Sequence, residues 1–486
     1  MKKSFLFNVF FMVFVNFLIK PFWVFGIDRT VQNKLGEQEY GLYFAIFNFT
    51  YLFQILLDFG LQNYNNREVA ADRSKINSLL PNILFFKTLL FIVYLVLCVA
   101  VAYPLGYLAK PFIWVILVNQ ILLSFTIYLR SNISAHQLFI KDALLSVLDK
   151  LLMIIFCGFL IWGNSSHFQL TVFNFALAQL AAYFITFLVC LFFSFRLTRR
   201  LRLSLDLNQF ISISRQTLPY AIIHFLMTTY YRIDGVMLER LQGSNGAAES
   251  GIYAQGYRIM ESLNNIGYLF ATILLPMFAY RIAQKSEIKT LLKSSLSIIY
   301  CLSVSLIVCF FTYRTELMQL LYNTADSGYS AEVFGYLLLN FFPVAILYVI
   351  GTLLTANQNF RLMIATLVTA VILNISLNYI LIIRMGAKGA GIATLITQLY
   401  MLACYSVYTF RIFKLRFNYK YVLQLSGFAS ICLSLVFILK TFRFSASIPL
   451  DLAYHICLYL ICIPFLSYVL GLVNLKSLEL KVGYKE

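Results

Sequence analysis

The sequence predicts an all-α polytopic membrane protein with about 14 transmembrane helices. Hydrophobic residues make up 61% of the 486 residues, charged residues only 12%, and the mean hydropathy is +0.80. A soluble chain has roughly a quarter of its residues charged. Since a spanning helix takes about 20 apolar residues, fourteen would use about 280 and leave roughly 14 for each connection or tail. That leaves no room for a soluble catalytic domain, so we do not expect an enzyme.

The apolar runs define the predicted helices in chain order. The first follows Lys2 and Lys3 and looks like a signal peptide, but it continues to Phe25 without a small-residue cleavage site, so we interpret it as an uncleaved membrane helix. Later runs have the length of a membrane span. The runs cover residues 4–25, 41–62, 82–103, 111–131, 143–162, 169–195, 216–238, 251–279, 292–312, 331–355, 362–383, 388–410, 421–439 and 451–473.

A weak internal repeat predicts how these helices are grouped. The motif Y-G-L-Y at residues 40–43 opens helix two, and S-G-I-Y at residues 250–253 opens helix eight, 210 residues later. This offset maps helices 1–6 onto helices 7–12, the two-lobe plan common in transporters. We predict a six-helix lobe at 1–200, a second at 201–415, and an added helix pair (13 and 14) with a tail at 416–486.

The basic residues predict the orientation. The chain carries 38 Lys and Arg against 20 Asp and Glu, a net charge of +18. If the N-terminus is cytoplasmic, 25 of the 38 fall on the cytoplasmic side and 10 on the other. Because cytoplasmic loops are enriched in Lys and Arg, both termini are predicted to be cytoplasmic. The remaining three, Lys87, Arg232 and Arg258, fall inside predicted helices.

Three groups of motifs resemble a known family. They are L-G-E-Q-E-Y-G-L-Y at 35–43 with L-D-F-G-L at 57–61 and N-R-E-V-A at 66–70; G-I-Y-A at 251–254 with Y-R at 257–258 and L-P at 275–276; and L-N at 373–374, N-Y-I-L at 378–381 and G-A-K-G-A-G-I-A-T-L at 386–395. In order and spacing, over nearly the whole chain, the sequence resembles the Wzx-type flippases, the polysaccharide-transport branch of the multidrug/oligosaccharidyl-lipid/polysaccharide flippase superfamily.

The resemblance implies two six-helix lobes with an added pair, and a V-shaped cavity that opens alternately to each face. It implies a cargo of undecaprenyl-diphosphate-linked oligosaccharides, moved from the inner to the outer leaflet of the bacterial cytoplasmic membrane for O-antigen (lipopolysaccharide), capsule or similar surface polysaccharides. The motifs expected of the lipid II flippase are absent from this sequence, which favours the saccharide branch.

Five basic residues are the predicted substrate-binding residues: Lys20, Arg67, Lys87, Arg232 and Arg258. A charge in mid-bilayer costs about 2.5–3.5 kcal/mol on insertion scales, and a diphosphate would need such cations to cross. Arginine pairs with phosphate oxygens in a bidentate manner. The alternatives are that Lys20 and Lys87 reach the helix ends and that Arg67 is an inside anchor.

Two carboxylates, Asp234 and Glu261, are predicted to couple transport to a proton or sodium ion, since a buried carboxylate can take up a proton. Simple ion pairing is the alternative: Arg258 and Glu261 are i, i+3 neighbours, whereas Arg232 and Asp234 point to different sides of their helix. Three tyrosines, Tyr230, Tyr231 and Tyr257, are candidates for stacking on sugar rings.

Two other functions stay open from the sequence alone. A MATE-like drug or cation antiporter would favour an acidic cavity, and a polytopic glycosyltransferase or polymerase would carry acidic motifs or a large outer domain. The expected partners are the lipid-linked oligosaccharide, membrane lipids, a coupling ion and a polysaccharide polymerase, with no nucleic acid. Nine cysteines and four histidines show no ligand spacing, so no metal or cofactor is expected.

Overall fold

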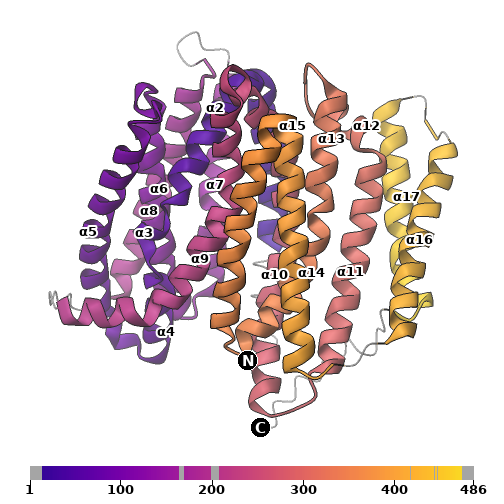
Figure 1. The fold of residues 1–486 in the computed structure, drawn as a ribbon. Helices are drawn as coiled ribbons and strands as arrows, with labels where there is room; N and C mark the ends of the chain where they lie inside the picture. The colour runs from indigo at the N-terminus through magenta and orange to yellow at the C-terminus, as the bar shows by residue number, and fades with distance from the viewer. Residues whose placement is uncertain are drawn as a thin grey trace. The chain divides into compact units, whose positions relative to one another are not determined.

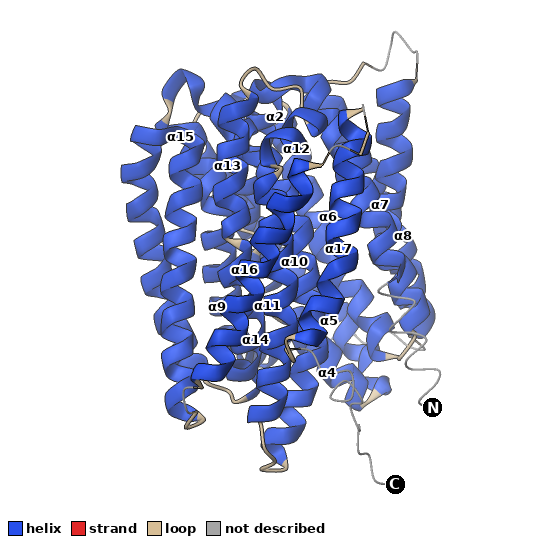
Figure 2. Ribbon diagram, turned by 90° about the vertical axis from the view of Figure 1, so that its right-hand side faces the viewer, coloured by secondary structure: helices blue, strands red, loops and turns tan. Residues whose placement is uncertain are grey.

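The computed structural model describes residues 14–163, 169–198, 207–415, 418–442, 444–445 and 447–472. All regular elements in these residues are helices, joined by short loops (Figure 2). These helices follow the apolar runs of the sequence. A bilayer requires helices of this kind, because within it the backbone must satisfy its hydrogen bonds internally. The all-α polytopic prediction is therefore confirmed.

Ten helices of the described residues are long and apolar enough to cross a membrane. The longest, α15 (Phe360–Ile412), has 53 residues, and it is interrupted at Gly386, where φ is 57°. A left-handed φ of this kind is available to glycine at little cost. The predicted number of fourteen spans stays a prediction.

The chain divides into two compact units, Met1–Ala254 and Gln255–Glu486. The boundary falls inside one helix, α10 (Gly246–Ala283), so the division into units does not follow the internal repeat of the sequence. The predicted lobes at 1–200 and 201–415, and the added pair with the tail at 416–486, therefore remain a prediction.

The first unit begins with residues 14–21, which are helical. It continues with η1 (Phe22–Asp28), α2 (Arg29–Leu52), α3 (Ile55–Asp58), α4 (Leu61–Ala71), η2 (Arg73–Lys75), α5 (Ile76–Ala102), η3 (Tyr107–Ala109), α6 (Phe112–Ala135), α7 (Phe139–Trp162), α8 (Val172–Leu197), α9 (Leu207–Leu241), η4 (Gly243–Asn245) and the start of α10. Helix α6 packs against α8, α8 against α7, and α2 against α9 (Figure 1).

The predicted helix two is broken in the structure. It runs as α2, then α3, then α4, and the chain turns at Phe59 and Gly60, with φ of 47° and 81°. A bulky residue rarely adopts a positive φ, so this break is a costly local conformation that the surrounding structure has to hold. Helices α3 and α4 pack against α5, α6 and α9.

The second unit contains the rest of α10 and α11 (Lys289–Thr312), α12 (Arg314–Leu321), α13 (Ser327–Leu339), α14 (Phe341–Ala356), α15, α16 (Tyr419–Thr441) and α17 (Ile448–Val469). Helices α16 and α17, drawn in yellow in Figure 1, lie side by side against α11. Cys301 and Cys309 of α11 pack there against Phe428 and Cys432 of α16 and Tyr459 of α17.

Two glycines make the closest crossing of helices in the first unit. A Cβ atom placed on Gly41 of α2 would lie 1.8 Å from the carbonyl oxygen of Ala247, and one placed on Gly251 of α10 would lie 2.1 Å from that of Glu37. Glu37 and Gly41 are four residues apart on α2, and Ala247 and Gly251 are four residues apart on α10. Each pair therefore lies on one face of its helix. The repeated motif of the sequence thus marks where α2 and α10 touch backbone to backbone, as small residues allow in membranes.

Candidate functional site

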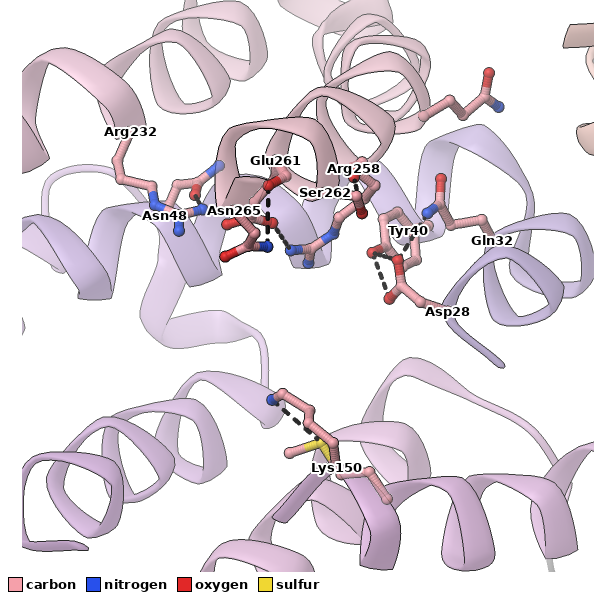
Figure 3. Close-up of polar contacts among 12 residues, drawn as sticks. Asp28, Gln32, Tyr40, Asn48, Lys150, Arg232, Arg258, Glu261, Ser262 and Asn265 are labelled. Atoms are coloured by element: carbon pink, nitrogen blue, oxygen red, sulfur yellow. Dashed lines mark hydrogen bonds and ion pairs between the residues drawn. The ribbon is translucent and has the colours of Figure 1, made fainter. Parts of the chain in front are cut away.

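Arg232 lies two to three turns from the C-terminal end of α9, within the helix, as the sequence predicts. Its guanidinium Nη1 donates a hydrogen bond to Asn48 Oδ1 at 3.3 Å (Figure 3). Its Cζ lies 4.7 Å from the centre of the Tyr51 ring. Both partners belong to α2, which packs on α9. An aromatic face of this kind attracts the cation.

Arg258 and Glu261 of α10 form an ion pair. Nη1 of Arg258 lies 2.9 Å from Oε2 of Glu261, with the two side chains 15% and 34% exposed (Figure 3). The pairing of i, i+3 neighbours considered from the sequence is thus present in the structure. Ser262 and Asn265 donate to the backbone carbonyls of Arg258 and Glu261, which fixes this face of the helix. Their roles in substrate binding and ion coupling stay predictions.

Asp234 is 1% exposed and accepts a hydrogen bond of 2.7 Å from the Tyr253 hydroxyl. Tyr253 belongs to the first turns of α10, within the same unit. The rings of Tyr230 and Tyr231 lie 5.0 Å apart, so these two candidates for sugar stacking contact each other. Neither observation tests the predicted ion coupling or stacking.

Lys87 of α5 is fully buried. Its Nζ donates to the carbonyl oxygen of Leu57 at 2.6 Å and to Ser124 Oγ at 2.8 Å, and it lies 3.4 Å from Asp58 Oδ1. An ammonium has three donors, and these contacts use all three. The role of Lys87 in substrate binding stays a prediction; in the structure its ammonium links the end of α3, just before the break, to α6.

The remaining two predicted cations lie away from this buried arrangement. Lys20 is half-buried in the helical stretch before η1. Arg67 of α4 has a side chain 65% exposed, pairs with Glu68 at 3.1 Å and lies near the Tyr64 ring. These contacts resemble those of an anchor at a helix end, which is the alternative that the sequence leaves open for Arg67.

Sequence reasoning missed an intramembrane lysine. It counted Lys150 with the cytoplasmic cations, but this residue lies in the middle of α7, roughly 17 Å from its first residue. Its Nζ lies 3.2 Å from Asp149, 5.7 Å from the centre of the Trp23 ring and 5.5 Å from that of Tyr183. The signal was present, because Lys150 falls inside the apolar run at 143–162.

A buried carboxylate was missed as well. Asp28, at the end of η1, is 2% exposed and accepts hydrogen bonds from Tyr40 Oη at 2.9 and 3.1 Å and from Gln32 Nε2 at 2.9 Å (Figure 3). The predicted first helix ended at Phe25, which left Asp28 in a loop. Gly36, with φ of 77°, instead separates the end of that helix from the next, so the first helix runs further than predicted.

The described residues contain no group of three or more His, Cys, Asp or Glu side chains placed to hold a metal ion. Their intramembrane polar groups are cations, carboxylates, amides and tyrosines. Such a set offers both donors and acceptors of hydrogen bonds.

A family model described as polysaccharide biosynthesis protein matches residues 6–282, more than half of the chain. The chain belongs to this polysaccharide biosynthesis protein family. No curated protein matches the sequence.

Solved structures share the fold. The lipid II flippase MurJ in an inward closed conformation matches with a TM-score of 0.74 and 13% identity over 94% of this chain and 98% of that one. An inward-facing multidrug resistance MATE family transporter of the MOP superfamily matches with 0.66 and 13% identity, over 84% and 98%. The Vibrio cholerae MATE transporter VcmN in the bent form matches with 0.57 and 14% identity, over 86% and 99%.

These matches show that the chain has the fold of these solved structures, in agreement with the all-α polytopic fold class predicted from the sequence.

Proposed function

We propose that this protein flips undecaprenyl-diphosphate-linked oligosaccharides from the inner to the outer leaflet of the bacterial cytoplasmic membrane by alternating access. The cargo would serve O-antigen, capsule or a similar surface polysaccharide. The observation that carries the proposal is Arg232, a cation inside a membrane helix on a neutral amide and an aromatic ring. A diphosphate is the part of such a cargo that needs a cation in the membrane.

The proposal extends to the predicted energy source and partners. Asp234 and Glu261 would couple transport to a proton or sodium gradient, and both termini would lie in the cytoplasm. A polysaccharide polymerase would receive the cargo in the outer leaflet. Lys20, Arg67, Lys87 and Arg258 complete the proposed set of cations.

A MATE-like export of cationic drugs is the second candidate. The buried carboxylate of Asp28 favours it, since an acid attracts cations, and the fold is shared with MATE transporters. Arg232 argues against it, because a cation within a membrane helix repels a cationic cargo. Lys87 and Lys150 face Asp58 and Asp149, so they bear little on this choice.

The experiment is complementation of cells that depend on this chain for surface polysaccharide. We expect Arg232→Ala to reduce glycan export at least tenfold with protein levels unchanged, and Arg232→Lys to retain part of it. The matched control is Arg361→Ala, which removes an exposed arginine at the start of α15. Export that is equal for both alanine variants would contradict the role of Arg232.

A second experiment tests ion coupling. Purified protein in liposomes should transport faster under an imposed proton or sodium gradient, and Asp234→Asn or Glu261→Gln should remove that response. Transport indifferent to both gradients would exclude these two carboxylates from coupling.

A further inference from the structure

A cavity lined by both polar and apolar side chains lies at the break of helix two, inside the first unit. Its volume is about 130 Å³, and it is bounded by α2, α3, α4, α6 and α9. We call it the helix-two cavity. Since one water needs roughly 10–15 Å³ on this measure, the space holds a cluster of waters or one sugar ring. The lining residues used below are Tyr51, Gln54, Asp58, Gln62, Ser124 and His224.

The lining combines donors and acceptors at close quarters. Gln54 and Gln62 each offer an amide oxygen and an NH₂ group, and Asp58 offers a carboxylate. His224 is exposed and contributes an imidazole, whose Nδ1 lies 3.4 Å from the Thr228 hydroxyl. Neighbouring hydroxyls of a sugar both donate and accept hydrogen bonds. A lining with both donors and acceptors therefore matches them better than a lining of donors alone or acceptors alone.

The charge of the cavity favours a neutral ligand over a cation. The Asp58 carboxylate lies 3.4 Å from the fully buried ammonium of Lys87, which belongs to the wall behind it. The two opposite charges offset each other, so the cavity has little net charge with which to attract a cation. The other side chains used here, Tyr51, Gln54, Gln62, Ser124 and His224, include no second carboxylate.

Tyr51 lies between the cavity and Arg232. His224, Thr228 and Arg232 follow one another at intervals of four residues and so lie along one face of α9, about 12 Å from first to last. Tyr51 belongs to both places, because its ring lies under the Arg232 guanidinium and also lines the cavity. A phosphate on Arg232 would thus place its attached sugar toward the cavity.

We propose that the helix-two cavity is a saccharide subsite, which binds the sugar next to the diphosphate while Arg232 binds the diphosphate. This inference rests on the proposed function and makes it more specific. The cavity recognises hydroxyl groups of the first sugar, and Arg232 recognises the part common to all polyprenyl diphosphates.

The test compares two probes on the purified full-length chain in lipid nanodiscs. One is the polyprenyl-diphosphate saccharide fraction extracted from flippase-deficient cells of the same strain; the other is undecaprenyl diphosphate without sugar. We expect Gln62→Leu and His224→Ala each to weaken binding of the first probe about three- to tenfold, the effect of one lost hydrogen bond, and to leave the second unchanged. Arg232→Ala should weaken both.

The control is Gln319→Leu, which removes an exposed glutamine on α12 and should change neither affinity. Thermal unfolding of each variant checks its folding; if His224→Ala unfolds, His224→Gln keeps a polar side chain and should show the same selective loss.

Equal binding of the saccharide probe by wild type and all cavity variants would overturn the subsite. If the wild-type chain binds neither probe, the proposed function itself fails. A loss of ion-dependent transport in Asp58→Asn, with saccharide binding unchanged in every cavity variant, would assign the cavity to ion coupling instead.

Discussion

Lys87 is the side chain that fastens the break in helix two. Its ammonium binds Leu57 O and Ser124 Oγ and faces Asp58, just before the two residues with left-handed φ. We expect Lys87→Met to lower the free energy of unfolding by about 1–3 kcal/mol, because it leaves buried acceptors and a carboxylate without their donor. Thermal unfolding in detergent measures this.

Lys289→Met is the matched control, since Lys289 is exposed at the start of α11 and should tolerate the change. A Lys87→Met protein as stable as wild type but unable to transport would support the role in substrate binding predicted from the sequence. It would argue against the fastening role.

Glu68 gives a pH dependence outside the spanning helices. The hydrogen bond from Lys75 at 2.6 Å lowers the pKa of the Glu68 carboxyl, and Arg67 acts in the same direction. A lowered carboxyl pKa stabilises the folded state above the unfolded value of about 4.3, and this contribution is lost as the pH falls through the folded value. Amide exchange in residues 61–75 should therefore speed up below about pH 4, beyond its intrinsic pH dependence. The variant Glu68→Gln should lack this acid step; its persistence there would implicate another group.

Pairs of charges close in sequence were predictable and isolated charges were less so. The Arg258–Glu261 pair follows from its i, i+3 spacing. Lys150 pairs with its sequence neighbour Asp149, but its ring contacts come from η1 and α8, and the contacts of Lys87 come from α3 and α6. The approach of these elements is set by packing, so no local pattern reveals these contacts.

At the scale of the elements, the crossing of α2 and α10 depends on two glycines. Gly41→Ala would place a methyl group against the Ala247 carbonyl oxygen, closer than any real contact. The helices would have to separate, and we expect a loss of about 1–3 kcal/mol, the usual cost of overpacking. Gly251→Ala should behave alike, as seen by thermal unfolding.

Gly427→Ala in α16 is the matched control, because a Cβ there would meet nothing within 4 Å. Alanine is the better helix former, so this variant should be as stable as wild type or more so. If all three variants lost the same free energy of unfolding, the contact of α2 and α10 would be no closer than an ordinary helix contact.

Helices were predicted better than their interruptions. The apolar runs gave the spans, but the run at 41–62 contains the turn at Phe59 and Gly60 as well as α3. Gly60 carries a turn signal; Phe59, with φ of 47°, carries none, because its conformation is imposed by the contacts around Lys87. Gly386 lay in a predicted connection, and the break observed there agrees with that position.

For the whole molecule, the distribution of Lys and Arg predicts both termini in the cytoplasm. Green fluorescent protein fused to the C-terminus should fluoresce in bacterial cells, and alkaline phosphatase fused there should be inactive. Moving the fusion point to the predicted outer loop near Lys440 should reverse both signals. Active phosphatase at the C-terminus would contradict the orientation and the assignment of cytoplasmic cations.

The charged pair at the centre of α7 has a consequence for biogenesis. Each charge costs about 2.5–3.5 kcal/mol at the middle of a newly inserted helix. Of the two rings beside Lys150, Trp23 precedes α7 in the chain and Tyr183 of α8 follows it. The ribosome delivers α7 before α8 exists, so the growing chain holds this lysine with Asp149 and the Trp23 ring until the next helix arrives. Completion of α8 is thus the step of synthesis that adds the Tyr183 ring to the surroundings of Lys150.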